Sequence, residues 1–132
     1  MPQLVKSWLE PFDWDFVVEV NRGLCARKNA LHKPTSDGYL PAKQLWEQSQ
    51  LKQITFSEAL QVCFRCHRLA PFCFYNGNTF AGIARDLVAD ISERLPPEKA
   101  FILRSVAGHI VAGTATDIET QQLEQMLDEL GA

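Results

Sequence analysis

Apolar side chains recur along this chain at intervals of three or four residues, and no segment of convincing length alternates between apolar and polar positions. The clearest run spans residues 80–95, where an apolar side chain returns about every 3.6 positions. That period places the apolar side chains on one face of an α-helix. The pattern therefore predicts an all-α fold, with residues 1–132 forming a single domain built as a bundle of about six helices.

Prolines and polar residues set the expected limits of the helices in the first half of the chain. The first helix is expected to begin near Asp13 or Trp14 and to end at about Asn29. Pro41 suits the first position of a short second helix, because proline lacks the N–H group that a position inside the helix would need. Pro71 is expected to end the third helix for the same reason.

Two capping-box patterns and a pair of prolines divide the rest of the chain. Thr55-x-x-Glu58 predicts the start of the third helix, and Thr116-x-x-Glu119 predicts the start of the last one. In each pattern the side chains of the first and fourth residues satisfy free N–H groups at the helix start. The fourth helix is expected to end at Pro96–Pro97.

The composition excludes several classes of protein. With 46% apolar and 22% charged residues, the chain is close to the soluble globular average, so disorder is not expected. A formal net charge of −3 provides no basic patch that could grip a nucleic-acid backbone. No run approaches the length of a membrane-spanning helix, and the acidic N-terminal segment lacks the apolar core of a signal peptide. We therefore expect a cytoplasmic protein without nucleic-acid or membrane partners.

The cysteines form the first candidate site. Cys63-x-x-Cys66-His67 has the spacing of a c-type haem attachment, and Cys73 or Cys25 could add ligands for zinc. However, Cys63 and His67 are one helical turn apart on an apolar helix face, where cysteine behaves as a small hydrophobic residue. A buried helix face is therefore the preferred interpretation, with no cofactor and no metal, and the metal or haem site is kept as an alternative.

The second candidate is the loop that follows Pro71. In Phe72-x-Phe74-x-Asn76-Gly77-Asn78, Asn and Gly both tolerate left-handed backbone conformations, so the turn can direct successive N–H groups into one concavity. The next helix is expected to begin at about residue 78 or 79. Its positive N-terminal end would add to the attraction for an anion.

These residues resemble the signature of the Fic/Doc family, His-x-Phe-x-(Asp/Glu/Asn)-(Gly/Ala)-Asn-(Gly/Lys)-Arg. The chain keeps Phe74, Asn76, Gly77 and Asn78 of that signature, and its last forty residues look like the tail of a Doc-type toxin. The resemblance implies an all-α fold with the motif in a loop between two core helices. It also implies transfer of AMP or phosphate from a nucleotide to a protein hydroxyl.

The chain departs from the signature where the chemistry of the family lies. Phe72 replaces the histidine that acts as general base, and a phenyl ring has no proton to exchange. Thr79 and Phe80 stand where the family has Lys or Gly followed by the phosphate-neutralising Arg. His67 is expected to face the core, and Arg85 lies too far along the next helix to replace that arginine. The ordinary chemistry of the family should therefore be lost or altered.

The leading hypothesis is a Fic/Doc-like helical protein without active AMP or phosphate transfer. No catalytic residue is assigned, and the expected partners are a nucleotide or phosphate and a protein. Weak binding of the nucleotide or anion is expected at the loop 72–80. The residues assigned to that site are Phe72, Phe74, Asn76, Gly77, Asn78 and Thr79.

An alternative is a helical protein-interaction module unrelated to that family. Four aromatic residues, Trp8, Phe12, Trp14 and Trp46, could form its exposed contact surface. This interpretation predicts that the four rings are accessible on the surface.

Overall fold

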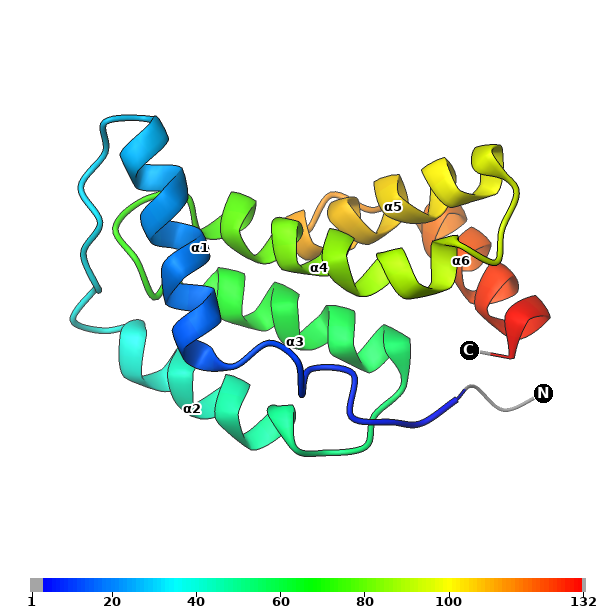
Figure 1. Ribbon diagram of the computed structural model, residues 1–132, viewed down its shortest axis with the longest axis horizontal. Helices are drawn as coiled ribbons and strands as arrows, with labels where there is room; N and C mark the ends of the chain where they lie inside the picture. Colours follow the sequence, from blue (N-terminus) through cyan, green and yellow to red (C-terminus); the bar gives the residue numbers. More distant parts are fainter. Residues whose placement is uncertain (1–3, 132) are drawn as a thin grey trace.

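The computed structural model describes residues 4–131, and this part of the chain contains six helices, of which the first two are joined by a long loop over residues 28–38 and the others by shorter ones (Figure 1). Its only extended pairing is at two isolated bridges, Lys6 with Ile54 and Pro34 with Phe72. The predicted all-α class and helix number are therefore confirmed. The helices are α1 (Trp14–Arg27), α2 (Tyr39–Gln50), α3 (Phe56–Leu69), α4 (Asn76–Ser92), α5 (Pro97–Ala112) and α6 (Asp117–Leu130).

Helices α3 and α4 lie side by side in the middle of the bundle (Figure 1). Helix α5 packs against both of them, and α2 packs against α3. Helix α1 crosses one end of the bundle and contacts α4, whereas α6 packs against α5. Within residues 4–131, no helix is both long enough and apolar enough to cross a membrane.

The core confirms the helical period seen in the sequence. Every apolar residue of α4 that belongs to the expected stripe is buried, which leaves the charged residues of that helix on the opposite face. Burying one large apolar side chain stabilises a fold by roughly 1.5–3 kcal/mol. The largest fully buried side chains are Trp46, Phe56, Phe72, Phe80, Leu9, Leu60, Ile83, Ile91, Leu103, Leu123, Leu127 and Val17.

The observed helix ends agree with the predicted ones where a capping box sets them, and they differ at several ends that no capping box sets. Both predicted capping boxes form, at the starts of α3 and α6. Helix α1 ends at Arg27 rather than near Asn29, because Asn29 has left-handed backbone angles with φ 53°. Helix α2 begins at Tyr39, so Pro41 lies in its first turn rather than at its first position.

Candidate functional site

The loop between α3 and α4 is closed by the side chain of Asn76. Its Oδ1 accepts a hydrogen bond from the Phe72 N–H at 2.9 Å, and its Nδ2 donates to the Phe72 carbonyl at 2.7 Å. Tyr75 precedes the helix with left-handed angles, φ 63° and ψ 31°. Together these features start α4 at Asn76, so the expected start at residue 78 or 79 is wrong.

Asn21, from the middle of α1, fixes the same loop from the other side. This fully buried residue donates through Nδ2 to the Phe74 carbonyl at 2.8 Å and to Thr79 Oγ1 at 3.0 Å. Its Oδ1 contacts His32 Nδ1 at 2.8 Å and accepts from the Cys25 thiol at 3.5 Å. A buried amide without partners would be costly, so these bonds tie α1 to the loop.

Sequence reasoning missed Asn21, although a signal was present. Val17, Asn21 and Cys25 follow one another at intervals of four and occupy the buried face of α1. A polar residue inside an apolar stripe must find hydrogen-bond partners after folding. The sequence could therefore have predicted that Asn21 contacts another segment of the chain, but not which segment that is.

Phe72 stands where the Fic/Doc signature has its histidine, and it is only 2% exposed. Its ring is stacked on Trp14, with centroids 6.1 Å apart and planes 11° apart, and also contacts Tyr39 and His32. Burial, and after it the positive charge of Arg22, lowers the pKa of His32. A neutral imidazole therefore packs beside the phenyl ring at pH 7. Phe72 is a core residue, and a ligand at the surface cannot reach it.

The other aromatic residues of the motif also differ from what a ligand site needs. Phe80, at the position of the family's arginine, is fully buried and packs against Trp46 with ring centroids 5.9 Å apart. Phe74 is 48% exposed. Thr79 is buried, and its hydroxyl donates to the Tyr75 carbonyl at 2.7 Å. The positions at which the signature has its base and its cation are thus both filled by hydrophobic packing.

The free N–H groups of the first turn of α4 are what the loop can still offer to an anion. The N–H groups of residues 76, 77 and 78 have no acceptor one turn back along the helix, and no side chain of the described residues caps them. His67 borders this turn: a Cβ added at Gly77 would lie 3.3 Å from His67 Nε2. His67 Nδ1 lies 2.9 Å from the Val111 carbonyl, which can only accept, so Nδ1 carries a proton and Nε2 lies on the side of the turn.

The backbone of this turn does not use, at its glycine, the left-handed conformation that glycine tolerates. Gly77 does not have a positive φ; the left-handed residue is Tyr75. Asn78 lies inside α4 and is exposed, so it does not cap the helix. The amide that shapes the turn is Asn76, which bonds backward to the loop because the reversal of the chain occurs before it.

The cysteine site is not assembled by the fold. Cys63 and Cys66 are completely buried, and burial raises the pKa of both thiols, that of Cys66 to about 12. Both sulfurs are therefore protonated at neutral pH, whereas metals and haem thioether formation require accessible, reactive thiols. Within residues 4–131, no three His, Cys, Asp or Glu side chains are grouped so that they could hold a metal ion. His67, only partly buried, points to α5 and α4 instead.

The exposed aromatic surface expected for an interaction module is not present. Trp8, Trp14 and Trp46 are buried, and Phe12 is half-buried. The indole of Trp46 donates to the Phe12 carbonyl at 2.7 Å, which shows that these rings hold the N-terminal segment to α2. The prediction that these four rings form an exposed contact surface is therefore wrong.

Comparisons of the chain with protein-family models, with curated proteins and with solved structures give no match.

Proposed function

We propose that this chain is a Fic/Doc-like helical protein that has lost AMP and phosphate transfer and retains weak binding of a nucleotide or phosphate at the start of α4. The observation that carries the proposal is the burial of Phe72 among Trp14, Tyr39 and His32. A general base must be within hydrogen-bond reach of the substrate hydroxyl. Here that position holds a ring that is neither titratable nor accessible.

Retained binding is supported by the backbone rather than by side chains. Three N–H groups at the start of α4 have no hydrogen-bond acceptor among residues 4–131, and the positive end of the helix dipole lies at the same place. No lysine or arginine occupies the last two positions of the signature, where Thr79 and Phe80 are buried. Affinity should therefore be modest and should fall with added salt.

Transfer activity can be tested with labelled ATP and candidate target proteins. We expect no incorporation above a sample without the protein, for both the natural chain and Phe72→His. The substitution should not restore activity, because a histidine at that position would be enclosed by the aromatic rings and phosphate charge would remain uncompensated. Robust labelling of a target by the natural chain would contradict the proposal.

Binding can be tested by following backbone amide chemical shifts during titration with ATP, inorganic phosphate and adenosine. Shifts at residues 76–79 are expected with ATP and phosphate and not with adenosine, which serves as the phosphate-free control. Unchanged amide chemical shifts at residues 76–79 in millimolar ATP would contradict binding at this turn.

A further inference from the structure

A groove of about 460 Å³ lies between α4 and α5, along the length of the two helices rather than at the loop that connects α3 to α4. Small-molecule sites in proteins commonly have volumes of this size. Ala81 of α4 and Gly108 of α5 both line the groove, and the methyl group of Ala81 and the lack of a side chain at Gly108 leave room between the two helices.

The groove is bordered by two arginines from opposite sides. Arg85 comes from α4 and Arg104 from α5, both are exposed, and neither has a carboxylate within ion-pair distance among residues 4–131. The acidic residues Asp86 and Asp90 of α4 line a different hollow, beside the N-terminal segment. The groove therefore has a local positive charge that its own walls do not neutralise.

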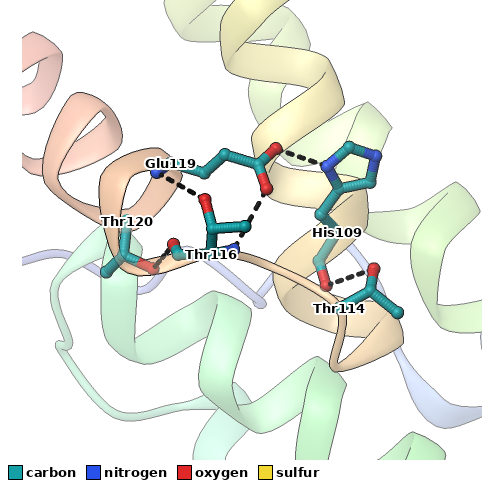
Figure 2. A network of polar contacts seen from close by, with 5 residues as sticks. All are labelled: His109, Thr114, Thr116, Glu119 and Thr120. Atoms are coloured by element: carbon teal, nitrogen blue, oxygen red, sulfur yellow. Dashed lines mark hydrogen bonds and ion pairs between the residues drawn. The ribbon is translucent and has the colours of Figure 1, made fainter.

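His109 lines the same groove, and its ring is held in place from α6. Its Nδ1 bonds to Glu119 Oε2, while Oε1 of the same carboxylate accepts from the Thr116 N–H at 3.0 Å (Figure 2). The Thr116 N–H, and after it the contact with His109, lowers the pKa of Glu119. The carboxylate is an acceptor, so Nδ1 carries a proton. The other ring nitrogen lies on the side of the ring away from Glu119 (Figure 2).

Two further residues of α5 complete the lining. Ser105 lies one turn before His109, and its hydroxyl has no hydrogen-bond partner among the residues that the structure describes. Phe101 lies one turn before Ser105 and is 65% exposed. An interval of four residues places these three side chains on one face of a helix. The groove thus presents an imidazole, a free hydroxyl and an aromatic ring in a row.

We propose that this groove binds a small aromatic phosphate monoester. Guanidinium groups recognise phosphate through paired charge-assisted hydrogen bonds, and Arg85 and Arg104 supply two of them from facing helices. The Ser105 hydroxyl donates to a phosphate oxygen, and His109, in the doubly protonated form that pairs with Glu119, donates to the same group through Nε2. The aromatic ring of the ligand packs on Phe101, which otherwise leaves a large apolar surface in water. This site is separate from the turn at 76–78 and does not rest on the function proposed above.

The test is a titration of the full chain with phenyl phosphate, inorganic phosphate and benzyl alcohol, followed by backbone amide shifts. Phenyl phosphate should shift residues 81–85 and 101–109, and it should bind more tightly than either of the other two compounds. Arg85→Gln and Arg104→Gln should each weaken binding by about tenfold or more. Phe101→Ala should weaken binding of phenyl phosphate but not of inorganic phosphate.

Arg94→Gln is the matched control, because Arg94 is also exposed and carries the same charge but does not line the groove. An equal loss of affinity in Arg94→Gln and Arg85→Gln would show a general charge effect and overturn the proposal. Shifts confined to residues 76–79 would also overturn it, while supporting binding at the start of α4. Shifts of the groove residues with unchanged amides at 76–79 would support this site alone.

Discussion

Replacing Phe72 by Ala should destabilise the protein far more than replacing Phe74 by Ala, although the two residues are only two positions apart. Phe72 is 2% exposed and touches three aromatic rings, whereas Phe74 is 48% exposed. Truncating a buried phenylalanine costs about 3–5 kcal/mol, and a substitution at the surface usually costs less than about 1 kcal/mol. The backbone hydrogen bonds of both residues are retained in the two variants.

The measurement is urea and thermal unfolding, followed by circular dichroism. A loss of about 3–5 kcal/mol corresponds to a fall of roughly 10–20 °C in melting temperature for a domain of this size. Phe74→Ala should melt within a few degrees of the natural chain. The Fic/Doc signature has its reactive histidine at the position of Phe72. Equal costs for the two variants, or a larger cost at Phe74, would therefore refute the burial of Phe72 on which the proposed loss of activity depends.

Three further predictions concern other parts of the molecule. Gly38→Ala should lower the free energy of unfolding by about 3 kcal/mol or more, because the added Cβ would lie 2.0 Å from a backbone oxygen at the end of α3. Gly23→Ala should instead stabilise α1 by about 0.5–1 kcal/mol, because its added Cβ would have no packing neighbour closer than 4.0 Å. Equal melting temperatures for the two variants would contradict this prediction. A thiol reagent should label only Cys73 in the folded protein and all four cysteines in denaturant, so fast labelling of a second thiol would contradict the described burial. The pKa of Glu119 is lower in the folded protein than in the unfolded one, so its ionised carboxylate stabilises the fold at pH values above the unfolded-state pKa. This contribution disappears as the pH falls through the folded-state pKa. Glu119→Gln should therefore lower the melting temperature at pH 7 and make little difference in strong acid; a constant difference would show that the charge is not responsible.

Local sequence signals were sufficient for the helices, because their causes are local. The period of apolar residues and the two capping boxes depend on neighbours within four positions, and both were confirmed. The turn before α4 was not predictable in the same way. Asn21 lies 53 positions from Phe74, so nothing in the loop itself reveals the bond between them. Likewise, the burial of Trp46 depends on Phe80, in a helix distant along the chain.

The residues that align with the signature have structural roles in this loop. Asn76 and Thr79 use their side chains to close the loop, and Phe72 and Phe80 fill the core on either side of it. What remains for a ligand at this turn is backbone N–H. Unpaired cationic side chains lie elsewhere on the surface, and Arg85 in the α4–α5 groove is one of them, with no carboxylate within ion-pair distance among residues 4–131.

The distance between the two places decides whether they can act together. Gly77, Ala81 and Arg85 follow at intervals of four, so they lie along one side of α4. Eight residues at 1.5 Å each separate the α-carbons of Gly77 and Arg85 by about 12 Å. A single phosphate group is only a few ångströms across and therefore cannot contact the first-turn N–H groups and the backbone near Arg85 together. The Arg85 side chain does extend back along α4, where one of its terminal nitrogens lies 4.0 Å from the Cβ that a substitution at Gly82 would add. Gly82 is itself five residues beyond Gly77, about 7.5 Å along the axis at 1.5 Å per residue. A phosphate held at the first-turn N–H groups and one held between Arg85 and Arg104 would therefore occupy different places on α4, and the two proposed sites should be titrated and mutated as independent ones.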